Sequence, residues 1–499
     1  MNKQTGPDAA DNQISTRPNV QISVSNFGPI ASGTVDLRPL TVFVGPSNTG
    51  KTYFATLIYA LSRQLVFGFA RLPIINWRIH SDRDGFQDVL KKLQTDARAL
   101  RLSDLPEGVR NVWQACLMEP DGLSGLLKTE LKRCFDLESV SGLVRLAGGT
   151  DDMKLSLHVR EEGQNLWHFN MGISKSGITV DGRIQDMVLF PPESAANERL
   201  QEVITRRWSP YSPREHESMA VEFYDALLYA AAGKRTEAYY LPAARSGIMQ
   251  SHAVISSSLL DRATRAGLER FPELPTFSGG MADFMQRLIL YKENERRGDI
   301  MKNLADALER DVLAGEILVR RAFPGGYPEF VYQPRKTEEI IPLSRASSMV
   351  SELAPVVLFL RSTVDRGDTL IIEEPEAHLH PEMQVTLTRI LAAAVRAGVR
   401  IIMTTHSEWV LEELANLVQA SNLTESDRRT ITGSGIALRA DEVGAWLFQP
   451  KKRPKGSVVQ EIPLNCESGT FSAGYEKVAV DVYNRWADIS GRTNKGGDK

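Results

Sequence analysis

The segment GPSNTGKT, at residues 45–52, combines two glycines, a lysine and a threonine at the spacing G-x-x-x-x-G-K-[ST]. Glycines permit a tight turn that aims backbone N–H groups at an anion, and a following helix adds the positive end of its dipole. In such a loop Lys51 reaches the β- and γ-phosphates of a nucleotide, and the hydroxyl of Thr52 binds Mg²⁺. A glycine-rich turn can match by chance, but the strand-like LTVFV before it and the helix-patterned YFATLIYAL after it favour the phosphate loop. We therefore predict an ATP site formed by Gly45, Pro46, Ser47, Asn48, Thr49, Gly50, Lys51 and Thr52, with Thr52 also a ligand of Mg²⁺.

A second candidate segment is TLIIEEPEAHLHPEMQ, from Thr369 to Gln384. The four largely apolar residues before its first two carboxylates are typical of a buried strand that reaches its carboxyl end, where open α/β sheets bind ligands. Glu373 then takes the place of the magnesium-associated acid, and Glu374 is the candidate catalytic residue that polarises the attacking water. The alternative is a zinc site at His378 and His380. Because that pair lacks a convincing third ligand, we prefer the nucleotide site.

A third segment, IIMTTHS, places a histidine at the end of another apolar run. A lone histidine is more often structural than catalytic. His406, however, follows a strand that comes one crossover after the acidic strand, so both belong at the same edge of a parallel sheet. We therefore predict that His406 is a catalytic sensor of the γ-phosphate.

Alternation of strand and helix patterns around these segments predicts the α/β class, with a parallel sheet in the C-terminal part. The segment 142–180 alternates like antiparallel strands joined by Gly- and Asp-bearing turns, and helical patterns precede and follow it. The predicted organisation is a disordered N-terminus (1–18), the first part of the head with the phosphate loop (19–70), a helical and antiparallel-strand insertion (71–235), a strand, helical segment and hairpin (236–335), the second part of the head (336–490) and a disordered tail (491–499).

Composition is that of an ordinary globular protein, with 42% apolar and 24% charged residues and a formal net charge of −3. No global positive field therefore marks a nucleic-acid binder. The three cysteines, Cys116, Cys134 and Cys466, are far apart, which argues against a disulfide framework. The first residues lack an apolar signal-peptide core, and no run reaches the ~18 apolar residues of a membrane span. We expect a cytoplasmic protein with no membrane partner.

In order and spacing, these motifs resemble the ABC-type, AAA-like ATPase heads of the RecF and OLD (overcoming lysogenisation defect) group. ISVSNFGPIASGTVDLRPLTVFVGPSNTGKT is similar to the family's entry strands and Walker A motif, TLIIEEPEAHLHP to its Walker B motif and D-loop, and TTHS to its switch histidine. The resemblance implies an ABC-ATPase head with a mixed central sheet, an antiparallel β subdomain and a helical insertion, which binds ATP and Mg²⁺. It covers about the first 65 residues and Ile341 to Leu417. No acidic cluster of the TOPRIM nuclease type follows His406, so we expect a head without its own effector.

SRASSMVSELAPVVLFL stands where the family places its signature helix, which serves the ATP site of a second subunit. Ser347 and Ser348 can offer hydroxyls there and cap a helix that we expect to begin near Ser351. Two residues depart from the family pattern. Met349 replaces the usual glycine and would crowd a γ-phosphate, and Glu373 replaces the usual aspartate while keeping its charge.

Three further segments are candidates for contacts with DNA or with the nucleotide. KKRPKG (Lys451 to Gly456) is a solvated hairpin tip or a contact for DNA phosphates, and we prefer the hairpin tip. RRGD (Arg296 to Asp299) is a weaker basic cluster. YYLPAARSG (Tyr239 to Gly247) ends a predicted strand at Arg245 and Ser246; we expect it to line the nucleotide face, with a structural turn as the alternative.

The resemblance leads to three functional hypotheses. The first is an ATP-hydrolysing switch that forms a homo-oligomer and acts with a separately encoded nuclease or toxin in anti-phage defence, as in PARIS-like and Septu-like systems; DNA or a phage protein would be its trigger. The second is a RecF-like ATPase of DNA repair or recombination. The third is a regulatory protein that binds ATP without appreciable turnover. All three rest on family analogy beyond the ATP site itself.

Overall fold

The structure is a computed structural model of the chain. It describes residues 19–63, 103, 123–145, 152–161, 164–174, 178–184, 237–265, 276–293, 299–321, 327–432, 435–453, 455–465, 470–471, 480 and 483–486. Most of the helical pattern predicted before the antiparallel strands, all of the helical pattern predicted after them, and the disorder predicted for both ends of the chain lie outside these residues.

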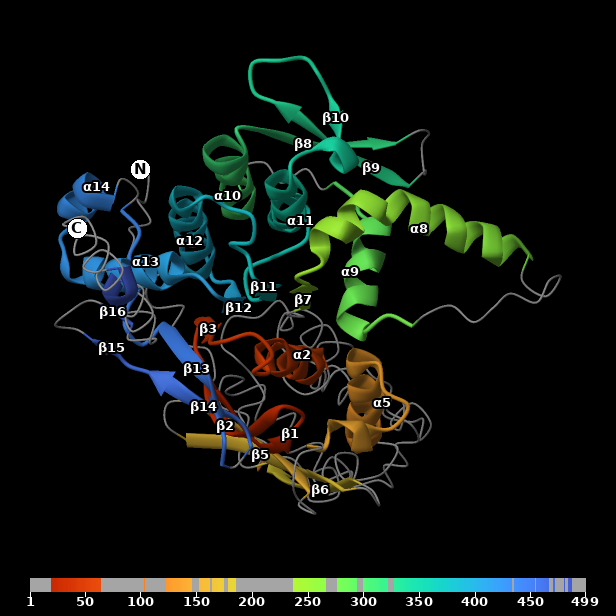
Figure 1. Ribbon diagram of the computed structural model, residues 1–499, viewed down its shortest axis with the longest axis vertical. Helices are drawn as coiled ribbons and strands as arrows, with labels where there is room; N and C mark the ends of the chain where they lie inside the picture. Colours follow the sequence, from red (N-terminus) through yellow and green to blue (C-terminus); the bar gives the residue numbers. More distant parts are fainter. Residues whose placement is uncertain are drawn as a thin grey trace, which may run out of the picture.

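One large mixed sheet organises the described part of the molecule (Figure 1). Its strand order is β6-β5-β4-β1-β2-β14-β13-β3-β12-β11-β7. The strands are β1 (Asn19–Phe27), β2 (Ile30–Leu37), β3 (Leu40–Val44), β4 (Met153–Glu161), β5 (Gln164–Ile173), β6 (Ile178–Ile184), β7 (Ala238–Leu241), β11 (Thr369–Glu373), β12 (Arg400–Thr405), β13 (Val443–Lys451) and β14 (Gly456–Ile462).

Half of this sheet is parallel and half is mainly antiparallel. Strands β13, β3, β12, β11 and β7 run parallel to one another. Strands β2, β1, β4, β5 and β6 form an antiparallel run. The predicted α/β class with a mixed central sheet and an antiparallel region is confirmed. Of the antiparallel strands predicted within the insertion, β4 pairs directly with β1, and β5 and β6 follow it outward, so the three strands extend the sheet of the head.

Helices cover the parallel half, and a smaller antiparallel sheet of β8 (Gly315–Arg321), β9 (Pro328–Pro334) and β10 (Ile341–Pro342) lies at the opposite end of the molecule from β5 and β6 (Figure 1). Strands β8 and β9 form the hairpin that the sequence predicts. The helices are α2 (Lys51–Leu61), α5 (Leu123–Phe135), α8 (Arg245–Arg265), α9 (Gly279–Ile289), α10 (Ile300–Leu308), α11 (Ser348–Ser362), α12 (Pro381–Arg396), α13 (Glu408–Gln419) and α14 (Glu425–Thr432). The short strands β15 (Leu464–Asn465) and β16 (Thr470–Phe471) pair with each other.

Two apolar cores lie on the two faces of the parallel strands. Leu370 and Ile372 of β11 belong to a core shared with helices α8 to α13, whereas Ile371 belongs to a core shared with α2 and α5. Successive side chains of a strand point to opposite faces, and burial of both faces explains why these strands are apolar throughout. By the same alternation, Glu373 lies on the face of β11 that is covered by α2.

A cluster of charged side chains joins α2 to the helices α5 and α9. The Asp283 carboxylate on α9 lies 2.8 Å from Arg63 Nη1 and 2.7 Å from Arg133 Nη2, and it accepts a 2.7 Å hydrogen bond from the Tyr59 hydroxyl. Glu130 lies 3.1 Å from Arg63 Nε and 2.6 Å from Arg133 Nη2. Two arginines and two carboxylates thus fix the C-terminal end of the helix that follows the phosphate loop.

Candidate nucleotide site

The sheet topology brings together segments that are far apart in sequence. Strands β3, β12, β11 and β7 are parallel neighbours in that order, so their carboxyl ends lie at one edge of the sheet. The phosphate loop follows β3, His406 follows β12, Glu374 follows β11, and Arg245 follows β7 after three residues. This edge is where open α/β sheets bind ligands, as the sequence predicted for the first three segments.

The phosphate loop has the backbone that its glycines predict. Gly45 has φ 135° and Gly50 has φ 98°, both in the region that favours glycine. Space is also short at both positions: a Cβ on Gly45 would lie 2.6 Å from the Phe448 carbonyl oxygen, and one on Gly50 would lie 2.8 Å from a side-chain carbon of Ile30. Both the backbone conformation and the close approach of Phe448 and Ile30 therefore require glycine at these two positions.

Lys51 opens helix α2 and has its ammonium group inside the loop. Its Nζ donates hydrogen bonds to the carbonyl oxygens of Gly45, at 2.8 Å, and Pro46, at 2.9 Å. Burial lowers the pKa of Lys51, and the carboxylates of Glu374 and Glu376 oppose that change. Those carboxylates therefore favour the charged form of the ammonium group beside the loop.

The donor set of this loop fits a polyphosphate. Gly50, the N-cap residue of α2, has no side chain to accept from the first backbone N–H groups, and the first turn has no acidic residue. These N–H groups, the helix dipole and the Lys51 ammonium all favour an anion. Thr52 is exposed at the same helix end, so its hydroxyl can reach a ligand.

Glu373, the predicted magnesium-associated acid, is buried and held by β7 and the residues after it. Its carboxylate accepts a 2.8 Å hydrogen bond from the Tyr240 hydroxyl and a 2.9 Å bond from the Ala243 backbone N–H. The Tyr240 hydroxyl also lies 3.3 Å from the Thr56 hydroxyl on α2. Burial and the neighbouring Glu373 raise the pKa of Tyr240, which therefore stays a neutral donor. This arrangement directs Glu373 toward the α2 face, where the phosphate loop lies.

Glu374 and His406 meet at the end of their strands. Their side chains approach to 3.6 Å between Glu374 Oε1 and His406 Nε2, and each is more than one-third exposed. Glu374 has φ 43°, which turns the chain away from the strand direction, and its N–H bonds to the carbonyl oxygen and the hydroxyl of Thr404, at 3.0 and 3.1 Å. A carboxylate and an imidazole thus face solvent side by side beside the phosphate loop.

Glu376 is a site residue that our sequence analysis missed. One of its oxygens accepts hydrogen bonds from the Thr405 hydroxyl, at 2.6 Å, and from the His406 backbone N–H, at 2.8 Å. Its other oxygen is buried and has no hydrogen-bond partner among the described residues. The available signal was a third carboxylate in the run EEPE, but only the pairing of β11 with β12 shows that it reaches the histidine segment.

The predicted signature serines lie at the start of α11. Ser347 is the N-cap residue, and its hydroxyl accepts a 3.4 Å hydrogen bond from the Val350 N–H. The helix begins at Ser348, so the predicted start near Ser351 was wrong; Ser347 supplies the cap three residues earlier. Ser347 and Ser348 are exposed, whereas Met349 is partly buried and packs against the core. The Met349 side chain is therefore drawn toward the core.

The other sequence candidates fall outside this arrangement. His378 is 58% exposed and lies 4.0 Å from a carboxylate oxygen of Glu352, and His380 precedes α12. Among the described residues, no three His, Cys, Asp or Glu side chains form a metal-binding group. KKRPKG joins β13 to β14, which confirms the predicted hairpin. Residues 296–298 of RRGD lie outside the described part of the chain.

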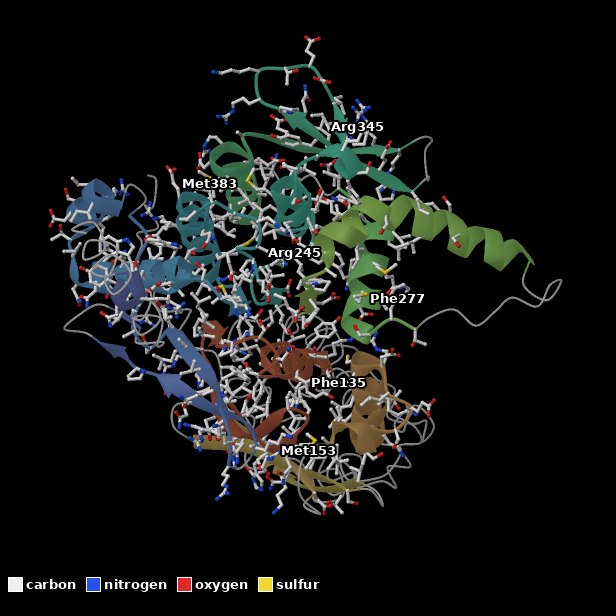
Figure 2. All side chains as sticks on the ribbon, in the orientation of Figure 1. Phe135, Met153, Arg245, Phe277, Arg345 and Met383 are labelled. Carbon is white, nitrogen blue, oxygen red and sulfur yellow. The ribbon has the colours of Figure 1, made fainter. Side chains whose placement is uncertain are left out.

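Arg245 does not line the nucleotide face. Its side chain is completely buried and donates to the backbone carbonyl oxygens of Pro242, Glu373 and Glu374. Figure 2 shows Arg245 near the centre of the view, between the helices on one side of the sheet and the phosphate-loop helix. It therefore supports the site from within.

A family model described as an AAA ATPase domain matches residues 283–411. The match runs from α9 into α13, so it includes Glu373, Glu374 and His406 and leaves out the phosphate loop. No curated protein matches the chain.

Several solved SMC head domains are similar to the chain. One is an SMC head bound to the C-terminal winged-helix domain of ScpA, at 10% identity and TM-score 0.40, covering 89% of this chain and 98% of that one. Another is the SMC head domain from Thermotoga maritima, at 12% identity and TM-score 0.35, covering 89% and 99%. A third is an SMC head with an extended coiled coil bound to the C-terminal domain of ScpA, derived from Pyrococcus furiosus, at 10% identity and TM-score 0.39, covering 93% and 100%.

Among the helices described, none has both the length and the apolar character needed to cross a membrane.

Proposed function

We propose that this protein hydrolyses ATP to ADP and phosphate at the edge formed by β3, β12 and β11. The observation that carries the proposal is the meeting of the phosphate loop with the Glu374–His406 pair, whose side chains lie 3.6 Å apart. The match of residues 283–411 to an AAA ATPase domain, which contains both acids and the histidine, supports the same activity.

Each residue has a role that its position allows. Backbone N–H groups of the loop and the Lys51 ammonium bind the phosphates. The Thr52 hydroxyl and Glu373 would hold Mg²⁺, which when bound neutralises part of the phosphate charge. Glu374 accepts a hydrogen bond from the attacking water and orients it toward the γ-phosphorus. His406, directly after the neighbouring strand β12, contacts the γ-phosphate and the same water.

We further propose that ATP drives association of two copies of the chain. Ser347 and Ser348 are exposed at the N-terminus of α11, where they can face the nucleotide of a second subunit. Met349 packs against its own core, so its side chain leaves the serines room to approach. The associated form would act in the cytoplasm on a separately encoded effector, a nuclease or toxin of anti-phage defence. A RecF-like role in DNA repair or recombination is the second candidate. The third is an ATP-bound regulator without appreciable turnover.

Lys51→Ala tests the ATP site. Removing the ammonium from the loop should weaken ATP binding and abolish Mg²⁺-dependent phosphate release. Lys128→Ala is the matched control, because Lys128 is an exposed lysine on α5. Phosphate release by Lys51→Ala at the rate of wild type would show that the phosphate loop is not the catalytic site.

Co-purification with the products of neighbouring genes, with and without ATP, tests the effector. An ATP-dependent complex with a nuclease or toxin supports the defence role. A complex with recombination proteins on gapped DNA supports the RecF-like alternative.

A further inference from the structure

Arg245 is the most completely engaged charged side chain at the site. Its guanidinium is fully buried and donates through three nitrogens. Nε lies 3.0 Å from both the backbone oxygen and a carboxylate oxygen of Glu352. Nη1 donates to the carbonyl oxygens of Pro242, at 3.2 Å, and Glu373, and Nη2 donates to that of Glu374, at 3.0 Å. A planar fork of donors is the feature that distinguishes arginine from lysine here.

Two of these bonds hold the backbone of Glu373, the predicted magnesium-associated acid, and Glu374, the predicted catalytic acid. Glu374 has φ 43°, a left-handed conformation that non-glycine residues seldom adopt. Such a conformation persists only where surrounding contacts fix it. Arg245 binds the carbonyl oxygen of Glu374, and Thr404 binds its N–H. The peptide groups on both sides of Glu374 are therefore fixed, and its side chain is left facing His406.

The remaining bonds join this arrangement to α11. Glu352 lies in the second turn of α11 and is buried, and its other carboxylate oxygen lies 4.0 Å from His378 Nε2. Burial lowers the pKa of Arg245, and Glu352 is the carboxylate that opposes this lowering most. The helix that begins with the exposed Ser348 is thus connected, through one buried ion pair, to the backbone of Glu374.

We propose that Arg245 is a positioning residue for ATP hydrolysis: its guanidinium holds Glu374 in the left-handed conformation that aims the carboxylate at the water, and Glu352 ties that conformation to helix α11. This inference rests on the proposed ATPase function. It predicts that disturbing the Arg245–Glu352 pair slows the hydrolytic step and leaves ATP binding intact, because ATP binds to the phosphate loop between β3 and α2. A purely structural role would lower stability without separating binding from hydrolysis.

The test compares Arg245→Lys with Arg361→Lys. Lysine keeps the charge but cannot form the fork of bonds to two carbonyl groups. Arg361 is the matched control: it is also a largely buried arginine in contact with a carboxylate, Glu309, and a backbone carbonyl, that of Ile317, but it lies on α11 away from the sheet edge. The measurements are the affinity for ATP, the single-turnover rate at saturating ATP and the melting temperature.

We expect Arg245→Lys to lower the single-turnover rate at least tenfold, with the Kd for ATP within threefold of wild type. Arg361→Lys should lower the melting temperature while the folded protein keeps its rate. Glu352→Gln retains a hydrogen-bonding group of the same size and provides a milder disturbance, which should lower the rate at least threefold. If Arg245→Lys does not fold, this second variant decides.

A single-turnover rate within twofold of wild type in folded Arg245→Lys would overturn the inference, as would equal losses of rate and affinity. Lys51→Ala in the same assay separates this outcome from failure of the ATPase proposal. An inactive Lys51→Ala beside a fully active Arg245→Lys removes only the positioning role. Equal hydrolysis by Lys51→Ala and wild type removes the proposed function itself.

Discussion

The chemistry of the site depends on how three carboxylates in the run EEPE are turned. Glu373 points to the α2 face and is held by Tyr240 and Ala243, Glu374 faces solvent beside His406, and Glu376 turns inward to the end of β12. Regular strand alternation would place Glu374 on the face opposite Glu373. The positive φ of Glu374 interrupts this alternation at the end of β11. Its carboxylate therefore faces solvent beside His406, whereas the carboxylate of Glu373 is buried.

Glu376→Gln should slow hydrolysis and leave ATP binding nearly unchanged. One oxygen of the carboxylate accepts from the Thr405 hydroxyl and the His406 N–H, and an amide would remove the negative charge from this buried position and put an NH₂ group in place of the oxygen that has no hydrogen-bond partner among the described residues. Loss of such a supporting group lowers activity by about tenfold or more in comparable sites. Steady-state kinetics measure the effect as a fall in kcat at constant KM. Glu413→Gln, which alters a buried carboxylate paired with Arg389, serves as the control and should keep its kcat.

At the scale of elements, ion pairs and hydrogen bonds of buried or partly buried carboxylates help to position the phosphate-loop helix and the parallel strands. The Asp283 cluster joins α2 to α5 and α9. Asp368, just before β11, accepts hydrogen bonds from the Glu237 and Asp365 backbone N–H groups, at 2.8 and 2.7 Å, and so aligns the start of β11 with β7. These contacts help to fix the position of Glu373, at the end of β11, relative to the phosphate loop, which precedes α2.

Asp283→Ala should lower the free energy of unfolding by about 2 to 3 kcal/mol, because it leaves two arginines in a partly buried cluster with one carboxylate. Asp311→Ala provides the comparison, since Asp311 pairs with Arg310 at the surface and an exposed pair contributes less than about 1 kcal/mol. Urea unfolding measures both values. Equal effects of the two substitutions would contradict a stabilising role for the cluster.

The stability of the protein should also depend on Asp368 and pH. Burial raises the pKa of Asp368 to about 6 from an ordinary 3.8, although two backbone N–H groups favour its ionised form. The folded state then binds more protons than the unfolded state between about pH 4 and 6, so this contribution is present below pH 4 and is lost as the pH rises through 6. Relative to Asp368→Asn, the wild type should lose of order 2 to 3 kcal/mol between pH 4 and 7. Urea unfolding of both proteins across this range measures the difference, and a constant difference would contradict the raised pKa.

At the scale of the whole molecule, the central sheet explains which features were predictable from sequence. LTVFV, TLIIE and RIIMTT each carry a run of apolar residues that is buried on both faces of the sheet, so their strand character and the polar residues that end them could be predicted directly. The Arg245 contacts and the Glu376 bonds could not, because they depend on which strands become neighbours. The antiparallel strands at 153–184 were predicted as strands, but their pairing with β1 spans more than a hundred residues and leaves no local signal.

Association of two subunits is the proposed consequence of this architecture. Glu374→Gln should make the ATP-bound state persist, because an amide keeps the size of the side chain but lacks the negative charge that polarises the attacking water. Light scattering should then show a larger mass for Glu374→Gln with ATP than without it. An ATP-bound variant with the mass of one chain in both conditions would contradict the participation of Ser347 and Ser348 in a second subunit's site.

The most direct test of the ATP site is the fate of the nucleotide bound to Glu374→Gln. After incubation with Mg²⁺ and ATP and removal of free nucleotide, the variant should carry intact ATP in near-stoichiometric amount, while wild type carries ADP. Its rate of phosphate release should be at least a hundredfold below that of wild type, with the affinity for ATP retained. Bound ADP and phosphate release at the wild-type rate would contradict the assignment of Glu374 as the residue that activates water.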